Sequence, residues 1–485
     1  MNYLSQITGR LGSRHPRNTT PAILLAAILL AVVPGCALTN PTNPYSGPPR
    51  QVTNSYATAP RAAVHSVEGP LTLTKAIHIS LANNPDLAAA RSGIDVATAH
   101  RDLAVGARLP NIHLVNRYSH SVNSQRIRRP SAPGESLAYT QDEVSSDIVL
   151  SMPIFAGGRL ISEIDAAELL QAASEDRLAH NRQELIYNLS SVFYRILSQR
   201  SVIESLQFSQ RTLKQHRDRV VELIAAQKAA KVDRLRTEVR IADLEQRLVR
   251  ERNVLAIQRR VLSNLLGIHQ TSTEPVDITG ELVVGSTVKT DVTKNLASAL
   301  HQRRDYLAAQ AALEAQAKRV DAARAGHYPT LSLQASYGGR WAAGTTAHPP
   351  GSNTSEDVGY VGLVLDIPLY EGGQIRARIR RERAYLSTAR AKLRKLELQI
   401  RLDVETAILN RCSSLERVKA TEKSIEQAQE SLRIEREKYD LGKGTITDIL
   451  DAQSALLTSQ TNYYRALADY NTALAQFHLA VGEKQ

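Results

Sequence analysis

Two carboxylates near the C-terminus are the residues whose spacing points most directly to chemistry. Asp448 and Asp451 lie three residues apart in a helix-forming segment, so they share one face of that helix. Carboxylates gathered in this way attract cations and repel anions. A structural role explains Asp448 equally well, because Thr445 and Asp448 have the spacing of a helix N-cap and its N3 partner. The residues alone leave both interpretations open.

No other constellation predicts catalysis or a cofactor. The sequence has no glycine-rich phosphate loop, no GxSxG motif and no Cys/His spacing typical of a metal site. Its net charge of +12 comes from 60 basic residues dispersed among 48 acidic ones. Such mixing is typical of solvated helical faces rather than of a nucleic-acid surface. We expect no enzyme, no cofactor or metal, and no nucleic-acid partner.

The N-terminus predicts an export signal. Three arginines precede an apolar run over residues 22–33, which is shorter than the roughly 20 residues of a membrane-spanning helix but fits a signal peptide. The run leads into "VPGC", which resembles a bacterial lipobox ending at Cys36, although its proline departs from the commoner form. We expect a signal peptide over 1–35 and a lipidated linker over 36–70. The alternative is an ordinary secretory signal with an incidental cysteine.

The rest of the chain is a tandem duplication. "LPNIHLVNRYSHS" is answered by "YPTLSLQASYGGR", and "VLSMPIFAGGRL" by "VLDIPLYEGGQI". The offset is 329 − 110 = 219 at the proline before the first strand of each copy, and 368 − 153 = 215 at the proline near the end of the second strand. We place the copies at 71–285 and 286–485. Each reads as helices, a β-hairpin and a long helical hairpin.

The two β-hairpins have the pattern of membrane strands. They are expected at about 111–154 and 330–369, and apolar residues alternate with polar ones along them. Strands of about 10 residues with one apolar face are typical of a transmembrane β-barrel. Two hairpins are too few to close a barrel, since the smallest have about 8 strands, so we expect oligomerisation. A soluble hairpin packed on helices is the alternative.

The helices predict a cylinder. The pairs Gly157-Gly158 and Gly372-Gly373 precede the longest helix of each copy. In the first copy about 70 residues without proline follow, or roughly 105 Å of helix. The following helix, 232–266, and the preceding one, 87–109, cover about 50 Å and 35 Å. Placed end to end, these two match the long helix. A stripe with a seven-residue spacing predicts coiled-coil packing of the last helix through Ile449, Leu456, Tyr463, Tyr470 and Phe477.

These features resemble the TolC-like outer-membrane efflux factor family, in its lipoprotein branch. The resemblance rests on the duplicated strand–Pro–Gly-Gly–long-helix unit and on "YDLGKGTITDILDAQSALL" at 439–457. It implies a mainly α-helical homotrimer with transmembrane β-strands. Each chain would give four strands to a 12-stranded outer-membrane β-barrel, continued by a long periplasmic α-helical barrel. It also implies a lipid-anchored location in the outer membrane with a large periplasmic part.

The resemblance further implies a function. Such proteins are exit ducts of tripartite efflux systems, which passively export drugs or other toxic small molecules. Their partners are a periplasmic adaptor (a membrane fusion protein) and an inner-membrane pump. Two alternatives remain: a duct of a type I protein secretion system, which has the same architecture, and a soluble coiled-coil scaffold, which belongs to another class.

The resemblance also assigns residues to a periplasmic gate. The family's gate aspartates fall on Asp448 and Asp451, and its gate tyrosine falls on Tyr439. A described relative has an arginine where this chain has Gly444, which puts a Tyr–Arg latch of that type in doubt.

The tip of the second copy and its counterpart in the first are the expected adaptor contacts. These are Gly442, Lys443 and Asp233, the last being the repeat of Asp448. Asp451 has no acidic counterpart, because the equivalent position is Arg236.

Overall fold

The computed structural model describes residues 69–127, 139–268, 278–285, 291–343 and 354–483, which all belong to one compact unit. The expected signal peptide and the linker up to residue 68, with Cys36, lie outside the described residues.

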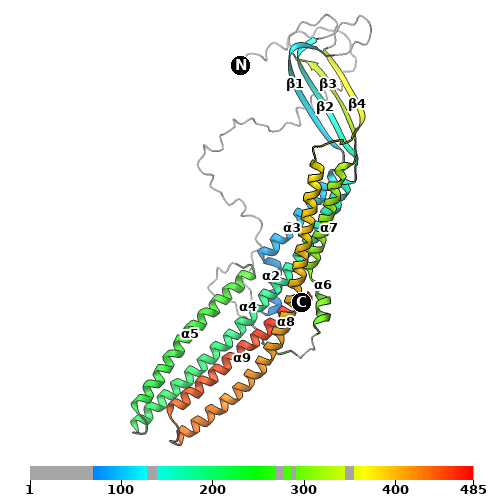
Figure 1. Cartoon of the computed structure of the whole chain (residues 1–485). Helices are drawn as coiled ribbons and strands as arrows, with labels where there is room; N and C mark the ends of the chain where they lie inside the picture. The colour runs from blue at the N-terminus through cyan, green and yellow to red at the C-terminus, as the bar shows by residue number, and fades with distance from the viewer. Residues whose placement is uncertain (1–68, 128–138, 269–277, 286–290, 344–353, 484–485) are drawn as a thin grey trace, which may run out of the picture. The chain divides into compact units, whose positions relative to one another are not determined.

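The strands of the two copies form one antiparallel sheet. β1 (Asn111–Arg126) and β2 (Tyr139–Ala156) come from the first copy, and β3 (Thr330–Ala342) and β4 (Ser355–Asp366) from the second. Their order is β1-β2-β3-β4, so β2 and β3 join the copies while β1 and β4 form the edges (Figure 1). Each copy contributes one hairpin, β1 with β2 and β3 with β4. β1 continues to Arg126 although its alternation is weak, and β4 ends at Asp366, three residues before the expected end, whereas β2 continues past the equivalent proline, Pro153.

One face of this sheet is apolar and the other polar. Ile112, Leu150, Ala335 and Val361 stand side by side in one row across the four strands. The row beside it, on the opposite face, holds Asn111, Ser151, Gln334 and Gly362. The apolar face is open, since Ile112 is 65% exposed and Val361 78%. The alternation in the sequence therefore sorts by face, as expected for strands with one apolar environment.

Glycine pairs convert each hairpin into a long helix. Gly158 (φ +87°) caps α4 (Arg159–Ala225), and Gly373 (φ +81°) caps α8 (Gln374–Asp440). Both helices contain 67 residues. Left-handed backbone of this kind is strained for residues that carry a Cβ, which explains why both copies have glycine there. The expected strand–glycine–helix transition is confirmed in both copies.

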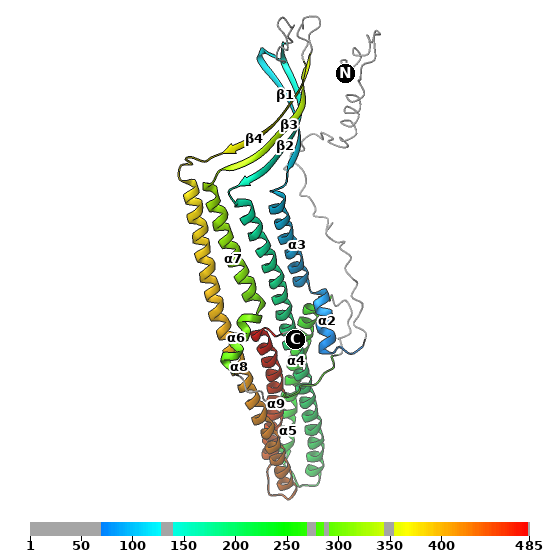
Figure 2. The same ribbon diagram turned by 90° about the vertical axis from the view of Figure 1, so that its right-hand side faces the viewer.

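Two shorter helices lie along each long one. In the first copy these are α3 (Pro85–Gly106) and α5 (Lys231–Leu265), which follow different stretches of α4 (Figure 2). Asn84 joins them: its side chain accepts from Asp86 and Leu87 at the start of α3, and its Nδ2 donates to the Leu265 carbonyl oxygen at 3.1 Å. The expected end-to-end arrangement is confirmed. α2 (Leu73–Asn83) precedes α3.

The second copy repeats this plan with α6 (Val292–Gln302), α7 (Arg304–Arg324), the short 3₁₀ helix η1 (Ala325–His327) and α9 (Ile446–Val481). The seven-residue stripe of α9 is packed as predicted. Ile449, Tyr470 and Phe477 are buried, while Leu456 and Tyr463 pack against buried clusters. Across the described parts of the chain, we find no helix whose length and apolarity would suit a membrane crossing.

Candidate functional site

The residues expected at the gate come together at one helical turn. α8 ends at Asp440 and α9 begins at Ile446, so Tyr439 lies in the last turn of α8. Gly442 (φ +71°) and Lys443 form the connection, and both aspartates lie in the first turns of α9. Asp233 occupies the matching place at the start of α5, the helix that leaves the tip of the first copy.

Asp448 completes a capping box. Its Oδ2 accepts hydrogen bonds from the Thr445 backbone NH at 2.9 Å and from the Thr445 hydroxyl at 2.7 Å. In return, the Asp448 NH donates to Thr445 Oγ1 at 3.3 Å. These bonds from Thr445 lower the pKa of Asp448, so its carboxylate stays charged at neutral pH. The structural role foreseen for this residue is present, and the side chain remains exposed to solvent.

Asp451 lies beside an arginine of the first copy. Its side chain is 72% exposed, and its Oδ1 lies 3.8 Å from Arg240 Nη2 on α5. One turn earlier, Arg236 Nη1 donates to Thr447 Oγ1 at 3.2 Å. Both pairs join α5 to α9. Sequence reasoning did not select Arg236 or Arg240 for this role, although the four-residue spacing of the two arginines matches that of Thr447 and Asp451.

Tyr439 is half-buried between the two copies. It packs against Ile449 of α9 and contacts the His216 ring of α4, with 5.8 Å between ring centroids. Burial raises the pKa of Tyr439, and the charges of Asp233 and Asp440 raise it further. Burial likewise lowers the pKa of His216, with help from Arg436 and Arg219. The ring of Tyr439 is therefore neutral at physiological pH and contributes packing rather than charge.

The turn itself leaves little room at Gly444. A Cβ there would lie 3.1 Å from the Tyr439 backbone nitrogen and 3.2 Å from Lys438 Cβ. The arginine that a relative has at this position would need a small shift of the turn. Lys443 donates its backbone NH to the Lys438 carbonyl oxygen at 2.8 Å, and its side chain is exposed.

The turn of the first copy has the same shape without the glycine. Gln227, which corresponds to Gly442, has φ +59° and is the one non-glycine residue with positive φ in the described ranges. The N-cap residue of α5 is Ala230, which has no side-chain oxygen that could accept a hydrogen bond. Asp233 still returns a hydrogen bond, since its Oδ2 accepts from the Ala230 NH at 3.3 Å. The first tip therefore keeps half of the cap and one of the two carboxylates.

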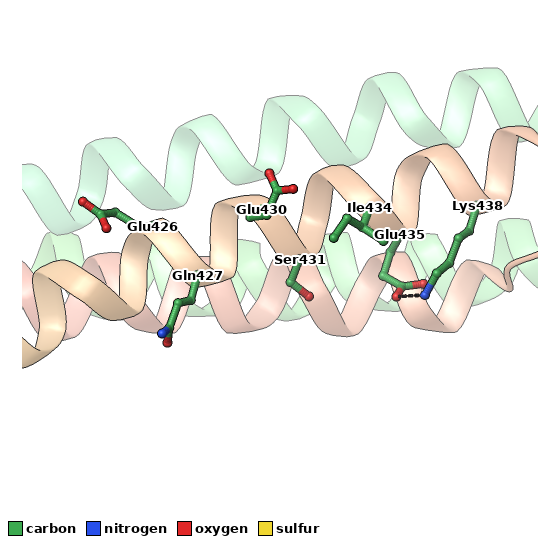
Figure 3. A pocket seen from close by; sticks show the side chains of 7 residues that line it. All are labelled: Glu426, Gln427, Glu430, Ser431, Ile434, Glu435 and Lys438. Atoms are coloured by element: carbon green, nitrogen blue, oxygen red, sulfur yellow. Dashed lines mark hydrogen bonds and ion pairs between the residues drawn. The ribbon is translucent and has the colours of Figure 1, made fainter.

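One face of α8 near the tip carries several glutamates. Glu426, Glu430 and Glu435 line a shallow hollow that lies along this one helix (Figure 3). Glu435 is paired with Lys438 at 2.7 Å. Because all of its walls come from one helix and it opens to solvent, the hollow is a charged surface rather than an enclosed site. Among the residues that the structure describes, no group of three or more His, Cys, Asp or Glu side chains is placed to hold a metal ion.

Comparison with known proteins agrees with this architecture. The family model of the outer membrane efflux protein matches residues 76–268 and 295–483. Outer membrane protein TolC of Vibrio cholerae serotype O1 is 22% identical over 403 residues, covering 82% of this chain and 88% of that protein. Outer membrane protein OprJ of Pseudomonas aeruginosa is 25% identical over 488 residues, covering 95% and 96%. The crystal structure of the Campylobacter jejuni CmeC outer membrane channel has a TM-score of 0.73 at 17% identity, covering 84% and 85%, and shows the shared fold.

A duplicated hairpin sheet that continues into paired long helices defines a channel-forming class of outer-membrane protein. The family model matches each copy separately, so the duplication and the family agree. This chain belongs to the outer membrane efflux protein family. It is an outer-membrane exit duct of an efflux system, and the alternative of a soluble coiled-coil scaffold is wrong.

Proposed function

We propose that three copies of this chain form a passive duct that carries toxic small molecules from a periplasmic adaptor and an inner-membrane pump to the exterior. The observation that carries this proposal is the four-stranded sheet, which has an exposed apolar face and two unpaired edges, β1 and β4. Lipid cannot satisfy the backbone groups of an open edge. The edges therefore need strands from other copies, and three sheets of four give the 12 strands of a barrel, within the range of known barrels that begins at about 8.

The proposed gate is formed by Tyr439, Asp448 and Asp451. Three copies would bring two carboxylates each, six in all, to one end of the helical cylinder. A ring of this kind favours cations and narrows or selects the pore. The charged state of Asp448 supports the proposal, because the capping bonds keep this carboxylate ionised while leaving it open to solvent.

The proposed adaptor contacts are Lys443, Gly442 and Asp233, which lie at the two tips where a periplasmic partner would meet the duct. The proposed anchor is lipid on Cys36 in the outer membrane. A duct for type I protein secretion shares this architecture, and its substrate rather than its channel would separate the two functions.

Two neighbouring residues of β4 test the proposed orientation in the membrane. Leu363 lies on the apolar face beside Leu333, and Val364 lies on the polar face beside Ser332. Leu363→Arg should cost about 2–4 kcal/mol if its side chain faces lipid at mid-depth, so we expect little trimer in detergent extracts and loss of ion conductance in planar bilayers. Val364→Arg should form a conducting trimer. Normal trimers and currents from Leu363→Arg, or a wild-type protein that extracts without detergent as a monomer, would contradict the proposal.

A further inference from the structure

Three arginines of the first copy reach oxygen atoms at the tip of the second copy. Arg219 of α4 lies 3.4 Å from Asp440 Oδ1. Arg236 and Arg240 of α5 reach Thr447 and Asp451, at the 3.2 Å and 3.8 Å given above. In each of these contacts the cation belongs to the first copy and the oxygen to the second.

The two contacts on α5 have a matched geometry. Because α5 and α9 both lead away from the tip, they run in the same direction, and the offset is 447 − 236 = 211 and 451 − 240 = 211. The contact therefore repeats after one helical turn. A groove of about 500 Å³ separates the helices here, with apolar walls from Leu235, Val239 and Leu450 between the polar pairs. The arginines thus bridge α5 and α9 across a groove that remains open to solvent.

The internal repeat cannot reproduce these contacts between two neighbouring subunits of the proposed trimer. Adding 215 converts Arg236 into Asp451 and Arg240 into Ala455, while subtracting 215 converts Thr447 into Val232. The corresponding contacts between neighbouring subunits would thus pair Asp451 with Val232 and Ala455 with Arg236, and neither is an ion pair. The arginine contacts are a property of the α5–α9 pair within each chain.

We propose that Arg236 and Arg240 are positioning residues of the gate, which hold the first turns of α9 against α5 and offset the charge of Asp451. The inference rests on the proposed function and assigns a different role to each of the two arginines. Arg240 sets how much carboxylate charge the tip presents, because it lies against one of the two aspartates of each chain. Arg236 acts on the position of α9 through its hydrogen bond to Thr447.

Three variants of the full-length protein, with one control, separate position from charge. In planar bilayers with a salt gradient, Arg240→Gln should raise the single-channel conductance and raise the cation-over-anion permeability ratio roughly two- to fivefold. Thr447→Val should raise the conductance and leave that ratio unchanged. The double variant Arg240→Gln/Asp451→Asn should return the ratio to the wild-type value. Arg234→Gln is the matched control, because Arg234 pairs with Glu238 on its own helix and changes net charge equally.

A distance measurement reads the same contacts when no current flows. Spin labels at Gln246→Cys of α5 and Thr458→Cys of α9, in a Cys412→Ser background, report the separation of the two helices. Arg240→Gln should broaden and lengthen this distance distribution, and Arg234→Gln should not. If Arg240→Gln matches Arg234→Gln in distance, the inference is wrong, whether or not the channel conducts. If the distances change as expected but the wild-type protein forms no channel, the proposed function fails and the structural contact stands.

Discussion

Gly442 and Gln227 occupy equivalent positions, 215 residues apart, in the turns that end the two helical hairpins. Their φ angles of +71° and +59° show that the backbone turns in the same way at both tips. The residues around them differ: the second tip has Thr445 as N-cap with Asp448 and Asp451 behind it, and the first has Ala230 with Asp233 and Arg236. The shape of the turn therefore does not depend on these side chains.

This difference separates what folding requires from what it tolerates. The first tip folds without an N-cap side chain and without a glycine, so the fold does not demand either feature at the second tip. Asp451 makes no capping bond, and its contact in the chain is to Arg240. Local folding therefore gives no reason for an aspartate at position 451, which supports a role of this carboxylate in the pore.

The glycine of the second tip should tolerate replacement poorly. Gly442→Val places a β-branched residue at φ +71°, where L-residues are strained by about 1–2 kcal/mol or more. Space is not the cause, since a Cβ at this position would meet nothing within 4 Å. Hydrogen exchange should show faster opening of 439–446, while 224–231 stays at the wild-type rate. Unchanged protection at 439–446 would mean that the turn can adopt another shape.

Removing the cap should make the second tip resemble the first. Thr445→Ala deletes the hydroxyl that bonds to Asp448, and loss of an N-cap costs about 1 kcal/mol. We expect the first turn of α9 to exchange its amide hydrogens about fivefold faster. Thr445→Ser, which keeps the hydroxyl, is the control. Equal exchange in the two variants would show that the cap does not stabilise the first turn of α9.

The opposite change should stabilise the first tip. Gln227→Gly relieves a left-handed residue of its Cβ and should gain up to about 1 kcal/mol, less the entropy that glycine adds to the unfolded chain. The measurement is slower hydrogen exchange at 224–231. A neutral result at this tip, with a large loss for Gly442→Val at the other, would show that the two turns are not equivalent in strain.

The smallest effect concerns pH. The pKa of Asp448 is lowered in the folded state, so its stabilising contribution is present above the unfolded value of about 3.9 and is lost as pH falls through the folded pKa. Between pH 5 and pH 3 the start of α9 should become less protected from exchange in the wild-type protein. Asp448→Asn should make this protection less dependent on pH. An unchanged pH dependence would show that other carboxylates cause it.

Residues that act locally were readable from the sequence. The glycine pairs before the long helices, the Thr445–Asp448 box and the stripe from Ile449 to Phe477 depend on neighbours within two or three turns. The end of β4 at Asp366 and the left-handed Gln227 were missed. The equivalent proline of the first copy, Pro153, lies inside β2, so a proline does not mark the end of these strands, and a left-handed glutamine has no local sequence signal. Arg236 and Arg240 were missed for a different reason. Their partners are more than 200 residues away, and only the packing of α5 beside α9 brings them together.

The measurement that tests the central claim most directly is block of the single-channel current by a multivalent cation. The comparison is between Asp448→Asn/Asp451→Asn in the second tip and Asp233→Asn in the first. If the carboxylates of the second tip form the gate, the double variant should need roughly tenfold more cation for the same block, and Asp233→Asn should stay close to the wild-type value. Equal block in all three proteins would place the constriction elsewhere and contradict the account.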